Sequence, residues 1–145
     1  MANTGPDNLS TLLSDYQVFY QKLRGYHWNV TGPNFLVLHQ QFETLYTEVA
    51  VVIDDLAERI RALGATPPST LAAALKLARL KEDETVPDAS TMVKNLLADL
   101  TALNGYTIDA RATAEQAEDL GSVMALDELI PAQQKAMWML RAYGV

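Results

Sequence analysis

Both histidines of this 145-residue chain lie in one short aromatic stretch, YHWNVTGPNFLVLHQQFE, which covers residues 26–43. His27 and His39 each have aromatic and aliphatic neighbours in the sequence. A buried imidazole is costly unless a partner satisfies its nitrogens. The two rings therefore need partners, and the acidic residues that follow them suggest a metal ion.

Two i,i+4 pairs lie on the helix predicted to follow this stretch. His39 and Glu43 are four residues apart and share a helix face. Asp54 and Glu58 form a second pair of the same spacing. From Glu43 to Asp54 a helix turns by about 1100°, within roughly 20° of three full turns, so all four side chains project from one stripe. Imidazole and carboxylate ligands without thiolates suit iron, manganese or zinc, and with open positions they favour ferrous iron.

One metal ion cannot reach both pairs from one chain, because Glu43 and Asp54 are roughly 16 Å apart along a helix axis. If two copies of this helix pack antiparallel, the His39–Glu43 end of one lies beside the Asp54–Glu58 end of the other. Such a twofold dimer has two identical sites with ligands from both chains. The Glu-x-x-His motifs of a di-iron bundle within one chain are absent. We therefore predict a metal site shared between subunits, and at least a dimer.

Hydrophobic periodicity predicts the helices that position these residues. Asn8 and Ser10 are plausible caps of the first helix, Ser69 or Thr70 of the short third one, and Pro131 is expected to kink the last helix or delay its start. The predicted helices are Leu9 to Val30, Phe35 to Leu63, Leu71 to Leu80, Ala89 to Ala117, and one from Gly121 through Leu140.

The fold class that follows is all-α: a four-helix bundle with a short extra helix in the connection between the second and third long helices. Strand patterns are scarce, and there are no repeats. We expect residues 1–145 to form a single domain, with residues 1–8 as a short flexible N-terminal tail.

Charge and composition limit the possible functions. The chain has 11 Lys and Arg against 18 Asp and Glu, a net charge of −7, and its first 21 residues contain no Lys or Arg. A nucleic-acid binder usually shows a basic face or tail, whereas an acidic surface attracts metal cations. Cysteine is absent, which excludes disulfides and thiolate metal sites. Without a signal-like N-terminus or a membrane-length apolar run, we expect a cytoplasmic protein.

The motifs resemble those of the Dps family of mini-ferritins, within the ferritin-like superfamily. The resemblance begins at His27-Trp28-Asn29-Val30 and continues through Leu38-His39 to Asp54-x-x-Ala57-Glu58-Arg59. It includes the end of the chain, Gln134-Lys135-x-x-Trp138-Met139-Leu140-Arg141-Ala142, and so covers most of the sequence.

The resemblance implies a hollow homododecamer that oxidises Fe(II), preferentially with hydrogen peroxide, at twofold interfaces. The ferric oxyhydroxide mineral would be stored inside the shell, which protects DNA from oxidative damage. By position, one subunit would supply His27, His39 and Glu43, and its partner would supply Asp54 and Glu58. Glu43 departs from the family, which usually has aspartate there.

The resemblance also implies a role for Trp28 and a role for Asp127, whereas Arg59 is singled out by its charge beside Glu58. Trp28 would trap stray radicals beside the iron, although a packed aromatic anchor is an equally good interpretation. Asp127 occupies a position that lines threefold iron-entry pores in the family, and Asp119 lies near it. Arg59 could balance the acidic site or form an ordinary surface ion pair.

Two alternatives remain open at this point. One is a nucleoid-compacting DNA-binding protein, which the family's name suggests, but an acidic shell without a lysine-rich terminus disfavours direct DNA binding. The other is a metal-binding scaffold with weak ferroxidase activity, which the substitution at Glu43 favours.

Overall fold

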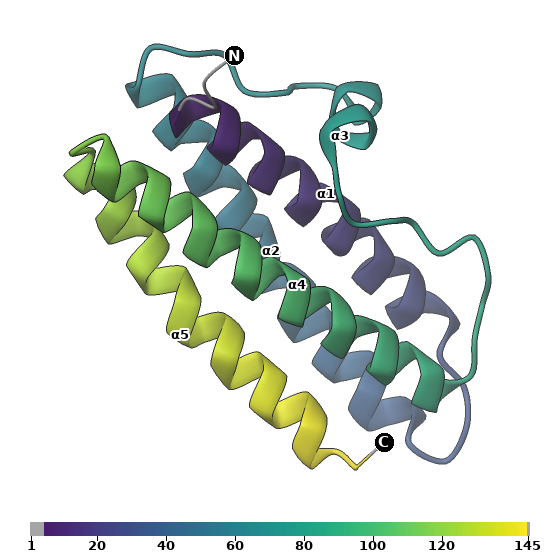
Figure 1. The fold of residues 1–145 in the computed structure, drawn as a ribbon. Coiled ribbons are helices and arrows are strands. Elements are labelled where there is room, and N and C mark those ends of the chain that lie inside the picture. Colours follow the sequence, from purple (N-terminus) through teal and green to yellow (C-terminus); the bar gives the residue numbers. More distant parts are fainter. Residues whose placement is uncertain (1–4, 145) are drawn as a thin grey trace.

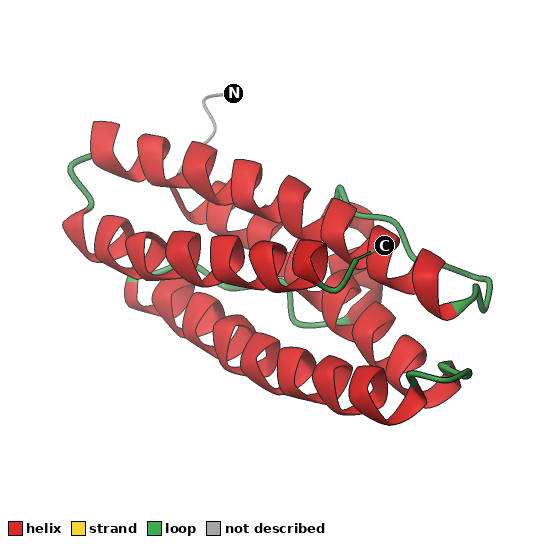
Figure 2. Cartoon of the chain, turned by 90° about the horizontal axis from the view of Figure 1, so that it is seen from below, coloured by secondary structure: helices red, strands yellow, loops and turns green. Residues whose placement is uncertain are grey.

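A computed structural model of the protein describes residues 5–144, and every regular element in this range is an α-helix (Figure 1). The helices are α1 (Gly5–Asn29), α2 (Phe35–Ala62), α3 (Leu71–Leu77), α4 (Ala89–Gln116) and α5 (Leu120–Ala142). The four long helices lie side by side along one direction (Figures 1 and 2). The predicted all-α bundle with a short additional helix is confirmed.

The chain direction makes two helix hairpins joined by one long crossover. Short turns join α1 to α2 and α4 to α5, so the helices of each hairpin are antiparallel. The connection from residue 63 to residue 88 returns along the length of the bundle and contains α3, which packs against α1 (Figure 1). As a result α2 and α4 run in the same direction, which is the topology of bundles with a single long crossover.

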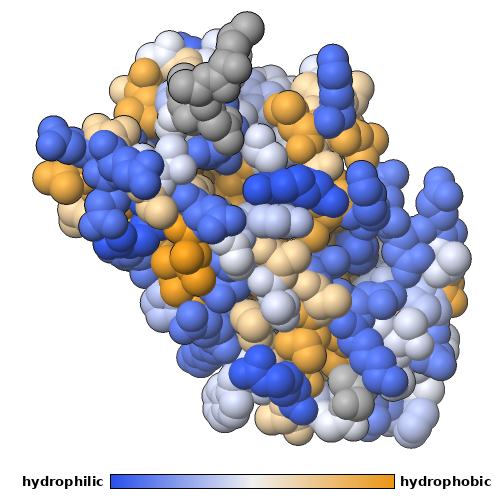
Figure 3. Space-filling model, in the orientation of Figure 1, coloured by the Kyte–Doolittle hydropathy of each residue, from blue (hydrophilic) through white to orange (hydrophobic). Residues whose placement is uncertain are grey.

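The interior is a continuous cluster of aliphatic and aromatic side chains from all four long helices. Each helix buries one face, as its apolar spacing predicts. Fully buried members include Phe19, Leu23, Phe42, Ile60, Leu96, Leu103 and Leu126. On the face shown in Figure 3, charged and polar side chains surround several separate apolar patches. Within the described residues, no helix is long and apolar enough to cross a membrane.

The first helix begins earlier than the sequence predicts, at Gly5 rather than Leu9. Residues 5–8, expected in a flexible tail, are therefore helical, and residues 1–4 lie outside the described part of the chain. Pro6 suits the first helical turn because its fixed φ matches a helix and its missing N–H would have no partner there. Asn8 and Ser10 lie inside the helix, so their prediction as caps is wrong.

Other boundaries also moved by a few residues. α3 begins as predicted, with the Thr70 hydroxyl accepting a hydrogen bond from the Ala73 N–H, but it ends at Leu77 instead of Leu80. α5 begins at Leu120 and continues through Pro131 to Ala142, so the proline neither stops nor delays it. Leu126 and Leu140 are buried on either side of the proline, and their packing holds the helix together across the missing hydrogen bond.

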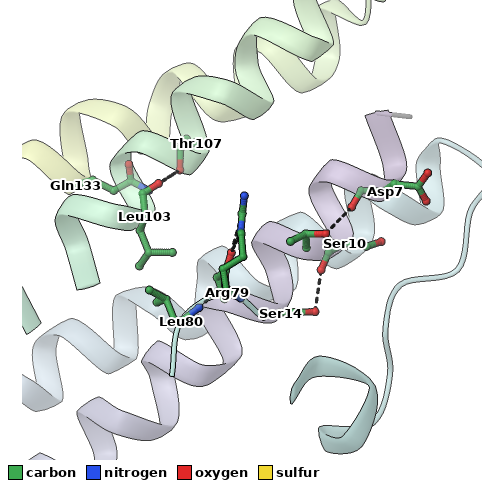
Figure 4. Close-up of polar contacts among 10 residues, drawn as sticks. Asp7, Ser10, Ser14, Arg79, Leu80, Leu103, Thr107 and Gln133 are labelled. Atoms are coloured by element: carbon green, nitrogen blue, oxygen red, sulfur yellow. Dashed lines mark hydrogen bonds and ion pairs between the residues drawn. The ribbon is translucent and has the colours of Figure 1, made fainter. Parts of the chain in front are cut away.

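A single buried carboxylate holds the crossover against α1. Asp15 is fully buried and accepts hydrogen bonds from the backbone N–H groups of Arg79 and Leu80 and from the Arg79 guanidinium. Figure 4 shows Arg79 and Leu80 directed toward α1. The Arg79 guanidinium also lies 3.6 Å from the ring centre of Tyr106 on α4. These bonds explain why α3 stops short of Leu80, since the Arg79 and Leu80 amides bond to Asp15 instead of continuing the helix.

A second buried polar group joins three helices. The Gln133 amide of α5 donates to the hydroxyl of Thr107 (Figure 4). It also donates to the Tyr16 hydroxyl and accepts a hydrogen bond from Asn104. Burial raises the pKa of Tyr16 to about 12, against the opposing effect of the Gln133 hydrogen bond. The tyrosine is therefore neutral at physiological pH and can donate a hydrogen bond of its own.

Removing the Asp15 carboxylate should be costly. We expect Asp15→Ala to lower the free energy of unfolding by about 3 kcal/mol, because it leaves two backbone N–H groups and a guanidinium without their acceptor. Denaturant unfolding followed by circular dichroism measures the change. Asp109→Ala, which removes an exposed carboxylate from α4, is the control and should change it by less than about 0.5 kcal/mol. Equal effects of the two substitutions would contradict the anchoring role of Asp15.

Candidate metal site

The two histidines are paired by reciprocal hydrogen bonds between α1 and α2. The Nδ1 of His27 lies 2.6 Å from the carbonyl oxygen of His39, and the Nδ1 of His39 lies 2.7 Å from the carbonyl oxygen of His27. The rings are stacked, with centroids 3.8 Å apart and an interplanar angle of 15°. His27 is in the last turn of α1 and His39 in the second turn of α2, so the tight turn between the helices brings them together.

These bonds determine which ring nitrogen carries hydrogen. A carbonyl oxygen can only accept, so Nδ1 is the donor in both rings. In the neutral imidazole the lone pair then lies on Nε2, the atom that remains for a ligand. A metal-binding histidine commonly donates its other N–H to a carbonyl or carboxylate, which fixes the tautomer and the ring orientation. The pair therefore has the arrangement expected of two metal ligands.

Two aromatic residues hold the imidazole pair from the side. The Tyr46 ring meets His27 edge-on with centroids 5.3 Å apart, and the Phe35 ring lies 5.1 Å from His39. Neither residue was predicted to have a role at the site. Phe35 is four residues before His39 and Tyr46 seven after it, so the helical spacing was the available signal.

The three predicted carboxylate ligands lie on the exposed surface of α2. Glu43, Asp54 and Glu58 are exposed in the single chain. No group of three histidine, aspartate or glutamate residues within residues 5–144 is arranged to hold a metal ion. One chain thus brings the two imidazoles together but leaves the carboxylates apart from them.

Trp28 lies outside the bundle interior. Its side chain is 57% exposed, and the Arg24 guanidinium lies 5.0 Å from its ring centre. Arg24 lies at a similar distance, 5.2 Å, from the ring of Tyr20. Trp28 is therefore not an anchor buried within its own chain, and its surface remains open to a partner or to a redox role.

The two predicted pore residues have polar partners. Asp119 caps the N-terminus of α5, where it accepts from the Ser122 N–H, and it forms a 2.6 Å ion pair with Arg59. Burial would raise the pKa of Asp119, but hydrogen bonds from Ser122 and Arg59 outweigh this and hold the pKa below its usual value. Asp127 is exposed and pairs with Arg111 at 2.6 Å. Their role in a pore stays a prediction.

A surface groove lies away from the five predicted ligands. A groove of about 300 Å³ separates α1 from the crossover and is lined by Lys22, Tyr26 and Asp83 among others, but by none of the five predicted ligands. There the Tyr26 hydroxyl donates to Asp83, and burial together with this carboxylate raises the pKa of Tyr26. These contacts fix the crossover to the end of α1.

Comparisons with known proteins agree on one family. Residues 6–144 match the ferritin-like domain. The chain is 41% identical over 135 residues to a DNA protection during starvation protein of Brevibacillus brevis, covering 93% of this chain and 91% of that protein. A protein of the same description from Porphyromonas gingivalis is 41% identical over 139 residues, covering 94% and 86%.

Solved structures show the same fold. A crystal structure of a Dps protein from Bacillus brevis superposes with a TM-score of 0.94 at 40% identity, covering 96% of this chain and 93% of that one. A Dps protein from Vibrio cholerae O1, described as a member of a broad superfamily of ferritin-like diiron-carboxylate proteins, has a TM-score of 0.93 at 37% identity and covers 96% and 87%.

The tautomer assignment can be checked directly. In the metal-free protein we expect both imidazoles as the Nδ1–H form, because each Nδ1 donates to a carbonyl. Nitrogen chemical shifts of ¹⁵N-histidine-labelled protein distinguish the two tautomers, and a His39→Gln variant assigns the two rings. An Nε2–H signal from either histidine would contradict the reciprocal bonding.

Proposed function

This chain belongs to the Dps family of ferritin-like proteins, and from that membership we propose that it is a ferroxidase that uses hydrogen peroxide and stores the ferric product. The family supports iron storage and DNA protection as its broad role. The finer assignment concerns the site: His27, His39 and Glu43 of one subunit, and Asp54 and Glu58 of the next, bind the Fe(II) substrate.

The observation that carries this proposal is the reciprocal bonding of the histidine pair. Each Nδ1 donates a hydrogen bond to a carbonyl oxygen, which leaves each Nε2 available to bind a metal ion. Two nitrogen ligands held without reorganisation, together with hard carboxylate oxygens from a second chain, form a site suited to ferrous iron. The carboxylates also offset the added positive charge when Fe(II) becomes Fe(III).

The proposed reaction balances with peroxide as the oxidant. Two Fe(II) ions each give one electron to one hydrogen peroxide molecule, and with two protons the peroxide becomes two water molecules. Both electrons are taken up together, so no hydroxyl radical is released. We propose that Trp28, next to His27 in the chain and 57% exposed, intercepts the radical that a single-electron event would form.

Glu43 is the one proposed ligand that departs from the family. It is one methylene longer than the aspartate usual in the family, and its side chain is exposed one turn beyond His39. A longer side chain displaces the carboxylate and weakens a second metal position more than the first. A site that binds one iron tightly and a second loosely would still oxidise iron, only more slowly.

Storage requires a closed assembly. We propose the homododecamer of the family, with the ferric oxyhydroxide mineral inside and Asp127 near the iron entry pore. DNA protection would then be indirect, through removal of Fe(II) and peroxide. The net charge of −7 on each chain disfavours contact with phosphates.

The first test is iron oxidation. We expect the parent protein, loaded with Fe(II) without oxygen, to show fast ferric absorbance with peroxide and slow absorbance with oxygen. Asp54→Ala/Glu58→Ala should fall to the protein-free rate, because it removes both partner carboxylates. Asp55→Ala removes a neighbouring carboxylate that points about 100° away on the helix and should leave the rate unchanged. If the parent itself matches the protein-free rate, the function is wrong.

The sharing of the site between chains has its own test. We expect two inactive variants, His27→Ala/His39→Ala and Asp54→Ala/Glu58→Ala, to regain activity when they are refolded together. A mixed dimer contains one site with all its ligands and one that keeps only Glu43. Half of randomly formed dimers are mixed, so about a quarter of the parent activity should return. If each site lay within one chain, the mixture would stay inactive.

A further inference from the structure

Arg59 follows the predicted ligand Glu58, yet its side chain is directed to another helix. Its Nε donates to the Ser122 hydroxyl at 3.0 Å, and one terminal nitrogen lies 2.6 Å from an Asp119 oxygen. The same carboxylate accepts from the backbone N–H and the hydroxyl of Ser122. Arg59 is therefore bonded to the first turn of α5. These bonds explain the position of its guanidinium without any contact to the candidate ligands on α2.

The approach of Arg59 depends on a glycine. A Cβ at Gly121 would lie 2.7 Å from the central guanidinium carbon and from one terminal nitrogen, and 2.8 Å from the other. Because the colliding atoms are the end of a flexible side chain, an alanine here would displace the guanidinium rather than the helix. Gly105 on α4 has nothing within 4 Å of the same added atom.

Hydrogen bonds hold α2 to a neighbouring helix near each of its two ends. Near its start, α2 is bonded to α1 through the reciprocal histidine bonds. Near its end, within residues 5–144, Arg59 makes the hydrogen bonds that join α2 to α5. A helix held by bonds at both ends cannot rotate about its axis, so the directions of the side chains between them are set.

A small rotation of α2 would displace its carboxylates by more than a metal site tolerates. Side-chain tips lie about 6 Å from a helix axis, so a rotation of about 20° would move a carboxylate by about 2 Å. Binding sites tolerate only about 0.5 Å of such displacement. Asp54 and Glu58 are exposed, and no hydrogen bond or ion pair described for residues 5–144 holds either carboxylate in place.

We propose that Arg59, bonded to Asp119 and Ser122 across Gly121, is a positioning residue that sets the rotation of the end of α2 and so aims the Asp54 and Glu58 carboxylates at the metal site of the neighbouring subunit. The proposal rests on the shared metal site proposed above. It gives Asp119 a part in the site that differs from a pore residue.

The test compares two substitutions that each add one methyl group. Gly121→Ala displaces the guanidinium, whereas Gly105→Ala adds the same group in open space. Co(II) serves as the metal probe, because its visible absorption reports on the ligands bound to it. We expect Gly121→Ala to bind Co(II) about tenfold more weakly, with a changed spectrum. Gly105→Ala should match the parent, and both variants should keep the parent's helical signal and sedimentation coefficient.

A second variant guards against a folding or assembly defect in the first. Asp119→Asn keeps a good helix cap but removes the charge that pairs with Arg59, so an intermediate loss of Co(II) affinity is expected. Parent-like Co(II) affinity and spectrum in both Gly121→Ala and Asp119→Asn would overturn the positioning role. If the parent itself shows no Co(II) binding that depends on Asp54 and Glu58, the shared site fails, and the positioning role fails with it.

Discussion

The exchange of hydrogen bonds between His27 and His39 is the contact on which the candidate site depends. Each ring donates to the backbone carbonyl of the other residue, so the bonds tie α1 to α2 and orient the imidazoles in one step. The short turn at residues 30–34 makes the exchange possible, and Gly32 takes a positive φ of 105° within it. A side chain with a Cβ would be strained in this conformation. The turn, the hairpin and the ligand pair are therefore one structural unit.

The second constraint is the length of α2. Its four candidate ligands lie on one stripe, but the helix separates them into two pairs too far apart for one ion. A single chain can carry both halves of the candidate site but cannot bring them together. Within residues 5–144, no group of three histidine, aspartate or glutamate residues is arranged to hold a metal ion. The exposed carboxylates are then a feature of the isolated chain, since a second copy related by a twofold axis would cover them. Folding prepares the ligands, and assembly would complete the site.

Buried and half-buried polar contacts fix how the helices stand relative to one another. Asp15 ends α3 early and holds the crossover to α1, Gln133 joins α5 to α1 and α4, and Arg59 joins α2 to α5. Apolar packing alone tolerates small rotations and shifts of a helix, whereas a hydrogen bond with defined geometry does not. In a bundle whose candidate ligands come from different helices, these contacts convert a stable fold into one with defined side-chain directions.

Local pattern was sufficient to predict the helices. The apolar spacing predicted five helices and the bundle because helix periodicity is a property of neighbouring residues. For the same reason, the spacing of His39, Glu43, Asp54 and Glu58 placed them on one face. The helix starts were predicted less accurately: the pattern put the first helix at Leu9, although Pro6 allows it to begin at Gly5.

Only the tertiary structure decided which groups meet across helices. The reciprocal histidine bonds involve backbone carbonyls, which no residue pattern marks. Arg59 bonds to α5 instead of balancing Glu58, and Asp119 caps a helix, because the α4–α5 turn brings that carboxylate beside the end of α2. Residues 59 and 119 are far apart in the chain, and their contact follows from helix packing. The sequence determined what each helix carries; the packing determined which of those groups are held in place and which remain free to bind.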